Sequence, residues 1–454
     1  MTNKQNLKIV FTFILILVGM ELEAQIDSQK MNVDEYLYKI ASSPSAGNIE
    51  KDIVKLVNFG TRHTLSDTVS NSRGIGAARR SIKASFEQIS KDCGNCLEVS
   101  FHRSLAKADN RRITKDTWIV NVLAVQKGTL YPNRYVLMSG DIDSRVSDEN
   151  NFTSDAPGAN DNASGMAGTI EAARVLSQYK FPVSIIFVGL SGEEQGLYGG
   201  KFLAETFKEK GYEIIGVLNN DMIGNIEGID GVIENNSFRI FSEAISMNLT
   251  EQQRNAMRFY GGEVDGPSRQ LARYIAGLTQ KYMTNLEPIM VYRLDRFGRG
   301  GHHRPFNDAG FPGVRIMETH ENYNRQHQDI RVENGISYGD VIEGVNFDYA
   351  SKLTGVNAIT LASLASAAEQ PKNVKIKGAV ESSAKLSWDL SSDKHLKGYK
   401  VYWRKTTDAT WENSKYVGKI TSYEFKNLVI DNFLFGVASV AENGAESVVV
   451  FPGN

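Results

Sequence analysis

Cysteine is nearly absent from this chain. The 454 residues contain only Cys93 and Cys96, which form a single Cys-Gly-Asn-Cys segment. In a cytosolic protein this spacing is typical of redox chemistry or of half a zinc site. A zinc site of this kind needs two more ligands nearby, and the sequence has no second such pair. We therefore favour a local structural disulfide in an oxidising compartment, away from the active site.

An excess of charge of one sign is also lacking. Lys and Arg number 51, Asp and Glu number 53, and the formal net charge is -2. This balance gives no electrostatic reason to expect nucleic acid or an anionic membrane surface as a partner. The apolar run Ile9–Val18 is too short for a comfortable membrane span, which needs about 20 residues. We expect no nucleic-acid partner and no membrane span.

The N-terminus has the pattern of a secretory signal peptide. Lys4 and Lys8 precede the apolar run, and a small residue, Ala24, stands where cleavage is expected. No cysteine follows the run, so a lipoprotein anchor is not expected. We predict that residues 1–24 are the signal peptide and that the mature protein is secreted or periplasmic.

Residues 25–368 are expected to form one catalytic domain. Its predicted strands are Trp118–Val125, Tyr135–Met138, Val183–Val188, Ile214–Leu218 and Val314–Met317. Its predicted helices are Ser164–Tyr179, Leu197–Lys208, Pro267–Tyr282 and Asp340–Ala365. Strands that alternate with helices predict an α/β fold, with a largely parallel, mixed sheet covered by helices on both faces. Ligand sites in such sheets lie beyond the carboxyl ends of the strands.

Residues 371–454 have a different pattern, with short β segments between turns. Strands are expected at Lys385–Trp388, Gly398–Arg404 and Phe433–Val440, as in an all-β, immunoglobulin-like sandwich. Trp388 and the Tyr399-Lys-Val-Tyr402 alternation resemble a fibronectin type III domain. This aromatic pattern reports core packing and leaves open whether the module binds protein or polysaccharide.

Acidic residues follow four successive segments of the α/β domain, mostly just past predicted strands. They are Asp141 and Asp143, Asp161, Glu193 and Glu194, and Asp221. A lone acid in a loop is usually a cap or a turn former. Carboxylates that converge at one edge of a sheet repel one another unless cations hold them together. Metal binding is therefore the economical explanation.

Zinc suits this set of residues. It accepts carboxylate oxygens and imidazole nitrogens, and its catalytic sites keep one position open for water. Paired ions lie about 3.5–4 Å apart and commonly share a bridging carboxylate. The adjacent acids Glu193 and Glu194 suit a division of labour, in which one binds metal and the other acts as a base. The sequence has no His-Glu-x-x-His motif, which excludes the single-zinc helical protease arrangement.

The same segments resemble a known family, the secreted co-catalytic di-zinc aminopeptidases of the bacterial leucyl aminopeptidase type. The resemblance extends from Leu56 to Ala365. Its markers are Ala-Pro-Gly-Ala-Asn-Asp161-Asn-Ala-Ser-Gly, Ser-Gly-Glu193-Glu194-Gln-Gly, Asn-Asp221-Met-Ile-Gly, Arg304-Pro-Phe with Ala-Gly-Phe-Pro, and Gln-His327 with Asp329. The resemblance implies a zinc-exopeptidase fold and the removal of residues from peptides or proteins with a free N-terminus.

The resemblance also implies roles for single residues. Asp161 resembles the carboxylate that bridges two zinc ions, Glu194 and His327 its partners on one ion, and Asp221 a ligand of the other. Glu193 resembles the general base that takes a proton from water and returns it to the departing amine.

The sequence departs from this family in the second metal site. The family usually has His-x-Asp where Asp141-Ile-Asp143 stands, and commonly Asp where His302 stands. Gln326 also replaces a frequent Tyr. We expect Asp141 to be a metal ligand by its oxygen, or else His302 to supply the missing imidazole, with Asp143 behind it to orient the ring.

Two other functions are weighed against the aminopeptidase. A glutaminyl cyclase-like transferase shares the fold and uses a single zinc, so a lost second ion would favour it. A metal-binding scaffold without turnover is disfavoured because Glu193 and Glu194 are both present.

Overall fold

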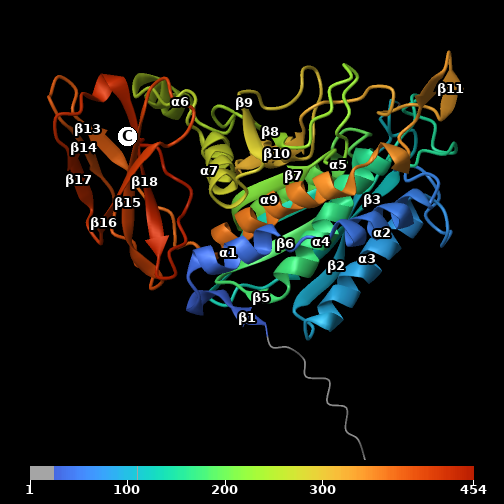
Figure 1. Ribbon diagram of the computed structural model, residues 1–454, viewed down its shortest axis with the longest axis horizontal. Coiled ribbons are helices and arrows are strands. Elements are labelled where there is room, and N and C mark those ends of the chain that lie inside the picture. Colours follow the sequence, from blue (N-terminus) through green and yellow to red (C-terminus); the bar gives the residue numbers. More distant parts are fainter. Residues whose placement is uncertain (1–24, 110, 454) are drawn as a thin grey trace, which may run out of the picture.

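An eight-stranded sheet forms the centre of the larger part of the protein (Figure 1). The computed structural model describes residues 25–109 and 111–453. The predicted signal peptide, residues 1–24, lies outside the described residues. The strand order is β2-β3-β6-β4-β7-β10-β8-β9. These strands are β2 (Leu97–Ala106), β3 (Thr117–Gln126), β4 (Tyr131–Asp141), β6 (Val183–Leu190), β7 (Glu213–Asn220), β8 (Ser237–Ser242), β9 (Glu287–Val291) and β10 (Gly313–Glu318).

The middle of the sheet is parallel. Strand β4 pairs in parallel with β6 on one side and with β7 on the other, and β7 pairs in parallel with β10. Every residue of β6 is buried, as expected for a strand covered on both faces. Antiparallel pairings join β2 to β3, β3 to β6, and β8 to β10. The prediction of a mixed, largely parallel sheet is confirmed.

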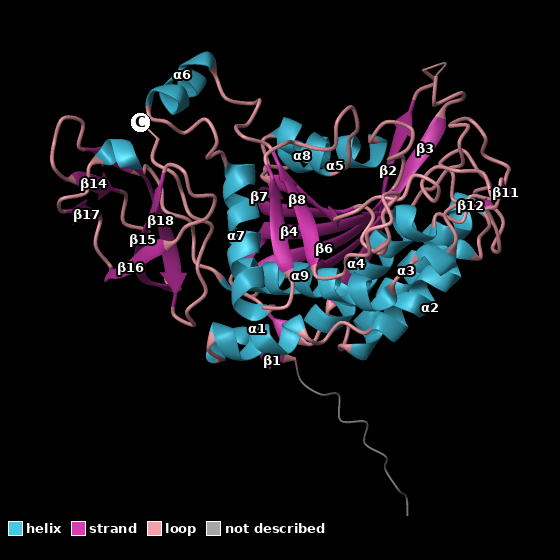
Figure 2. Ribbon diagram, turned by 45° about the horizontal axis from the view of Figure 1, so that its top comes forward, coloured by secondary structure: helices cyan, strands magenta, loops and turns pink. Residues whose placement is uncertain are grey.

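Helices cover both faces of the sheet (Figure 2). Helices α3, α4 and α9 pack on one face, with α1 and α2 outside them, whereas α5 and α8 pack on the other. The helices are α1 (Val33–Ala41), α2 (Ala46–Val57), α3 (Gly74–Asp92), α4 (Gly165–Leu176), α5 (Tyr198–Glu209), α6 (Glu251–Phe259), α7 (Pro267–Tyr282), α8 (His303–Ala309) and α9 (Phe347–Ser366). None of the described helices combines the length and apolar character that a membrane span requires.

The start of the last helix differs from its prediction, and the difference concerns the site. A helix was expected from Asp340, but α9 begins at Phe347, where the Asn346 side chain caps it by accepting from the Tyr349 amide. Asp340 instead lies in the loop before α9, and its carboxylate contacts the segment that carries Asp161. Strands β2, β8 and β9 and helices α1, α2, α3, α6 and α8 are not among the predicted elements.

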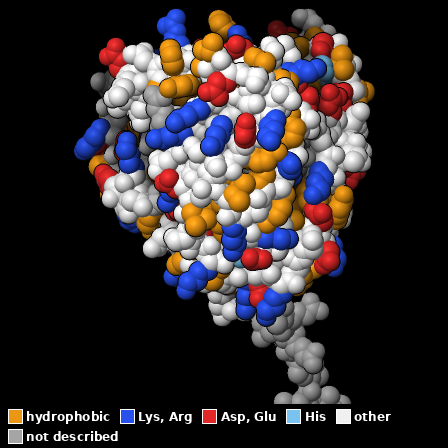
Figure 3. All heavy atoms as spheres, turned by 90° about the vertical axis from the view of Figure 1, so that its left-hand side faces the viewer, with side chains coloured by type: hydrophobic (Ala, Val, Ile, Leu, Met, Phe, Trp, Pro, Cys, Tyr) orange, Lys and Arg blue, Asp and Glu red, His pale blue; other side chains and the backbone are white. Residues whose placement is uncertain are grey.

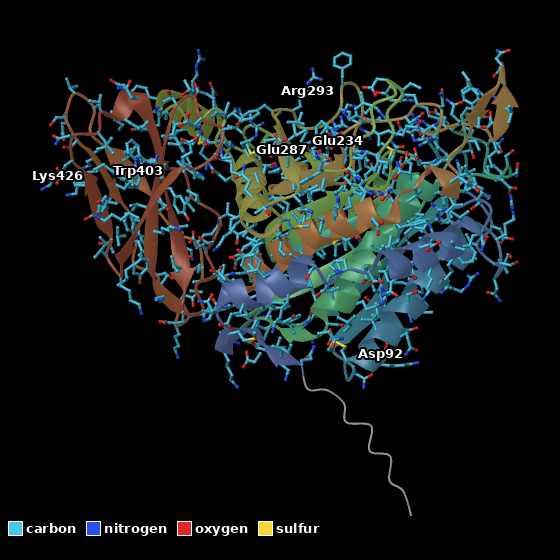
Figure 4. All side chains as sticks on the ribbon, in the orientation of Figure 1. Asp92, Glu234, Glu287, Arg293, Trp403 and Lys426 are labelled. Atoms are coloured by element: carbon cyan, nitrogen blue, oxygen red, sulfur yellow. A yellow bond between two sulfur atoms is a disulfide. The ribbon has the colours of Figure 1, made fainter. Side chains whose placement is uncertain are left out.

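A disulfide links Cys93 and Cys96, as predicted. It follows the C-terminus of α3, next to the labelled Asp92 in Figure 4. The pair is therefore a local link between α3 and β2, and it contributes nothing to the site.

The C-terminal module (residues 371–453) consists of two three-stranded antiparallel sheets, β13-β14-β17 and β16-β15-β18. Its strands are β13 (Lys375–Lys377), β14 (Ala384–Ser387), β15 (Leu396–Lys405), β16 (Asn413–Gly418), β17 (Ser422–Phe425) and β18 (Phe433–Ala441). Trp403 of β15 meets Phe425 of β17 with ring centroids 5.4 Å apart, which joins the two sheets (Figure 4). The outer face of the module carries mixed charges and scattered hydrophobic side chains (Figure 3).

A buried ion network docks the module onto the α/β part. Asp265, just before α7, accepts from Arg273 of α7 at 2.7 Å and from Arg404 of β15 at 2.9 and 3.0 Å. All three side chains are almost completely buried. Buried charges of this kind are tolerated only when paired, so the two parts depend on each other at this contact.

Candidate active site

Strands β4, β6 and β7 run in parallel and therefore end at the same edge of the sheet. Asp141 is the last residue of β4, Glu193 and Glu194 follow β6 by three and four residues, and Asp221 follows β7 directly. Parallel pairing thus brings together acids that are far apart in the sequence.

Three side chains form a compact group, which we call the His327 cluster: Asp161, Glu194 and His327. The Nε2 atom of His327 lies 2.9 Å from Oδ2 of Asp161 and 3.1 Å from Oε1 of Glu194. One donor atom from each residue lies within 4.8 Å of the others, a spacing that could hold a metal ion. No other such group of His, Cys, Asp and Glu occurs in the described part of the chain.

Arg145 supports the His327 cluster from the side. Its Nε donates to Oε2 of Glu194 at 2.8 Å, and its Nη2 lies 2.7 Å from Nδ1 of His327. One guanidinium thus fixes the orientation of a carboxylate and an imidazole that are contributed by different loops.

The segment that carries Asp161 is held by its backbone. The carboxylate of Asp340 accepts from the amide of Asn160 at 2.8 Å and from the amide of Asp161 at 2.7 Å. The Asn160 side chain donates in turn to both oxygens of the buried Glu318 at 3.0 Å. These contacts fix the position from which Asp161 reaches the site.

Asp141 and His302 are in direct contact. The Nδ1 atom of His302 lies 2.5 Å from Oδ1 of Asp141, and both residues are buried. The other oxygen of Asp141 accepts from Asn162 at 2.8 Å. The Nε2 atom of His302 is buried and has no hydrogen-bond partner. We expected Asp143 to orient this ring; the structure gives that contact to Asp141.

Asp143 holds the loop that carries the two glutamates. It accepts from the backbone amides of Glu193 and Glu194 at 3.2 and 3.1 Å, and from the Thr64 hydroxyl at 3.1 Å. The half-buried Glu193 side chain has no hydrogen bond to another side chain among the described contacts. Its carboxylate is therefore free to act on a bound molecule.

Asp221 has one oxygen engaged and one unpaired. Oδ2 lies 2.9 Å from Nη2 of the fully buried Arg315 and 3.9 Å from Nη2 of Arg296. Oδ1 is buried and has no partner. A buried polar atom without a partner is rare, and it indicates that something else binds there.

Burial and mutual repulsion shift the acid pKa values. Burial, and then the charge of Glu194, raise the pKa of Glu193 well above its usual value. Burial likewise raises the pKa of Asp141 to about 8 and of Asp221 to about 7. Burial opposes ionisation of Asp161 as well, but the hydrogen bond and charge of His327 outweigh it and lower its pKa. The site thus holds more buried carboxyl groups than its own cations can keep ionised.

Comparison with known proteins agrees with this geometry. The sequence profile of peptidase family M28 matches residues 121–339, which include most of the acidic residues described above. A protein named "Probable zinc metalloprotease" from Pyrenophora teres f. teres is 40% identical over 438 residues, covering 96% of this chain and 89% of that protein. The chain belongs to peptidase family M28. A second such protein, from Leptosphaeria maculans, is 40% identical over 420 residues, covering 92% of this chain and 97% of the relative.

Solved structures support the fold of this M28 chain. The Legionella pneumophila LapA aminopeptidase superposes with a TM-score of 0.52 and 17% identity, covering 73% of this chain and 75% of that one. LapB from the same organism superposes with a TM-score of 0.50 and 17% identity, covering 75% and 77%. At this identity the likeness concerns the fold alone.

The donor set of the M28 site suits zinc, which binds imidazole nitrogen and carboxylate oxygen. The His327 cluster offers one nitrogen and two carboxylates to an ion. Two further buried atoms without partners, Oδ1 of Asp221 and Nε2 of His302, are of the donor types that zinc accepts. The residues present therefore fit the metal.

Several contributors to the site were not predicted from the sequence. Arg145, Arg315 and Asp340 each contact a predicted site residue. Arg145 stands two residues after Asp143, so its position in an acidic loop was the one available signal. Arg315 lies within a strand and Asp340 in a segment expected to be helical, and neither position suggests a site.

Proposed function

We propose that this M28 peptidase is a zinc-dependent aminopeptidase that removes residues from the N-terminus of peptides. The observation that carries the proposal is the His327 cluster beside the unpaired carboxylate of Glu193. The names of the curated relatives, probable zinc metalloproteases, agree with it.

We propose two zinc sites. Asp161, Glu194 and His327 would hold the first ion, and Asp161 would bridge to the second. Asp221 and His302 would complete the second site through their unpartnered Oδ1 and Nε2 atoms. Asp141 would then orient the ring of His302, because its carboxylate contacts Nδ1 and leaves Nε2 free to bind the ion.

Zinc bound here would polarise the peptide carbonyl and lower the pKa of an attacking water. Glu193 accepts the proton of that water and transfers it to the departing amine. A raised pKa suits this role, because it makes the carboxylate a stronger proton acceptor. Asp143 keeps Glu193 in position through the backbone amides of the loop.

The acids at the sheet edge also suit recognition of a free amino group. In addition to burial, the charges of the surrounding carboxylates raise the pKa of Glu193, so a positively charged N-terminus bound beside them would relieve part of their repulsion. An acylated N-terminus offers no such charge. Cleavage would therefore be restricted to chain ends.

A panel of amino-acid amides, with zinc content measured in parallel, tests the proposal. We expect release of free amino acids from unblocked amides and none from N-acetylated ones. A peptide with N-terminal glutamine separates the aminopeptidase from the cyclase: free glutamine is the expected product, whereas ring closure with loss of ammonia would overturn the proposal. Absence of both reactions in zinc-loaded protein would favour a scaffold.

We also propose that the enzyme is exported and carries a fibronectin type III-like module. The disulfide Cys93–Cys96 supports an oxidising compartment. Two antiparallel three-stranded sheets with a buried Trp388 support the module type. N-terminal sequencing of protein recovered outside the cytoplasm should begin near Gln25, and a start at Met1 would argue against export.

A further inference from the structure

A cavity with a volume of about 1060 Å³ lies between the start of α3 and strands β2 and β3. None of the residues of the His327 cluster lines it. Its wall includes Thr64, whose hydroxyl donates to Asp143, so the cavity lies behind the loop that carries the two glutamates. We call it the Arg79 cavity.

Arg79 of α3 is the buried cation of this cavity. The residue is only 5% exposed, its Nε donates to the Ser191 hydroxyl at 3.3 Å, and its Nη2 has no hydrogen-bond partner. Burial lowers the pKa of the guanidinium to about 10, although the charge of Asp143 acts in the opposite direction. Burying a guanidinium N–H without a hydrogen-bond acceptor costs free energy. Such a donor is expected where a bound ligand supplies the acceptor.

The rest of the lining is also cationic. Five of the lining side chains are basic and two are acidic: Arg73, Arg79, Arg80, Arg103 and Lys115 against Asp67 and Asp116. The acids are already engaged, since Asp67 accepts from the amides of residues 69 and 70 and Asp116 pairs with Lys107. Two of the cations are engaged as well, since Arg73 pairs with Asp155 and Arg80 donates to the backbone carbonyls of residues 68–70. Arg103 and Lys115 are exposed, and neither forms an ion pair with a described acid.

Aromatic side chains form the remaining wall near these cations. Phe101, Phe152 and Trp118 line the cavity, and Trp118 is 58% exposed. The guanidinium of Arg103 lies 5.3 Å from the centre of the Phe101 ring, and the ammonium of Lys115 lies 5.6 Å from that of Phe152. The opening of the cavity therefore combines charge with apolar surface.

We infer that the Arg79 cavity binds a carboxylate attached to an aromatic or aliphatic body, with Arg79 as the anchor of the carboxylate. A guanidinium presents paired donors that match a carboxylate. The aromatic wall covers the apolar body. A peptide can present this chemistry in two ways, at its C-terminus or on an acidic side chain beside an apolar residue. This site does not depend on the proposed peptidase chemistry.

Calorimetric titration of the full-length protein tests the inference with three N-acetylated probes that cannot use a free N-terminus. N-acetyl-phenylalanine offers an α-carboxylate, N-acetyl-aspartyl-phenylalanine amide offers a side-chain carboxylate, and N-acetyl-phenylalanine amide offers none. We expect the amide to bind at least about tenfold more weakly than one of the two acids. Which acid binds better distinguishes the two sources.

Variants place the binding in the cavity. Arg79→Gln should weaken binding of the acid by about tenfold or more, and the exposed Arg103→Gln by a few-fold, whereas Arg258→Gln on the distant α6 should leave it unchanged. Trp118→Ala should reduce the preference for N-acetyl-phenylalanine over N-acetyl-alanine, because it removes aromatic wall.

A carboxylate could also bind to zinc, so His327→Ala is the decisive control. Unchanged affinity in this variant, together with loss in Arg79→Gln, supports the cavity. Loss of binding in His327→Ala would assign the probe to the metal site and overturn the inference. Equal affinity for acid and amide would also overturn it. Because Arg103 is exposed, Arg103→Gln keeps the test valid if Arg79→Gln fails to fold.

Discussion

At positions 141 and 302 this chain has the two residue types in the opposite order from the aminopeptidases that the sequence resembles. Asp stands at 141, where they usually have His, and His stands at 302, where they commonly have Asp. The two side chains meet in the folded protein at 2.5 Å, although they stand 161 positions apart in the chain. In this chain the carboxylate of the pair comes from the end of strand β4, and the imidazole comes from the residue just before α8.

Replacing His302 tests whether the imidazole serves a second ion. We expect His302→Ala to lose one of two zinc ions, because it removes the unpartnered Nε2 donor. Metal stoichiometry measured by mass spectrometry of the native protein reads this directly. His320→Ala is the matched control, since His320 contacts Asp230 at 3.1 Å, away from the His327 cluster. Two ions bound with unchanged affinity in His302→Ala would contradict the second site.

Glu193 and its neighbour should separate catalysis from metal binding. Glu193→Gln removes a proton acceptor but no proposed ligand, so kcat should fall by about 100- to 10,000-fold while zinc content stays nearly unchanged. Glu194→Gln, one residue away, should instead lower zinc affinity, because Glu194 belongs to the His327 cluster. Near-full activity of Glu193→Gln would refute the assigned base.

At the scale of elements, the loops at the end of the sheet are held by groups outside the proposed ligand set. The segment with Asp161 depends on Asp340, which stands immediately before the loop to α9. The loop with Glu193 depends on Asp143. Backbone amides donate in both cases, so the positions of the site residues are set through the main chain.

Asp340→Asn should weaken zinc binding although the residue is no proposed ligand. The two oxygens of Asp340 each accept from a backbone amide, and the amide of Asn presents a donor in place of one oxygen. Substitution of residues that hold metal ligands in place typically lowers metal affinity or activity by about 10- to 100-fold. Competition with a zinc-binding dye measures this affinity. The nearby exposed Glu343→Gln should behave as wild type, and an Asp340→Asn protein with wild-type affinity would show that the segment needs no such support.

At the scale of the whole molecule, the C-terminal module is fastened to the α/β part without contributing to its site. The module supplies no member of the His327 cluster. It supplies Arg404 to the buried network around Asp265, and Tyr274 of α7 donates to the backbone of Glu446 at 2.9 Å. The module is therefore expected to affect stability far more than catalysis.

Arg404→Gln separates these two effects. It leaves the buried Asp265 with Arg273 as its remaining ion-pair partner among the described residues and should lower the free energy of unfolding by about 3 kcal/mol. Urea unfolding measures this loss, while kcat on small amides should stay unchanged. Lys405→Gln, at the next, exposed position, should leave both quantities unchanged. A large loss of kcat in folded Arg404→Gln protein would show that the module shapes the site.

Local patterns in the sequence determined the α/β class, most of the central strands and the acid-bearing loops that follow them. Strand periodicity and loop composition are properties of neighbouring residues, so they can be read without the fold. Helix α7 was predicted with the bounds that the structure has. Strand β2 and helix α3 were missed. Buried and exposed residues alternate only in part along β2, and α3 begins with small residues.

Only the tertiary structure decided which distant side chains meet. Arg145 contacts His327 from 182 positions away, and Asp340 reaches the amide of Asp161 from 179 positions away. The crossovers between parallel strands bring these residues to one edge of the sheet, and sequence spacing carries no trace of that arrangement. The partner of His302 was decided in the same way, since Asp141 and Asp143 are equally plausible in the sequence but point to different neighbours in the fold.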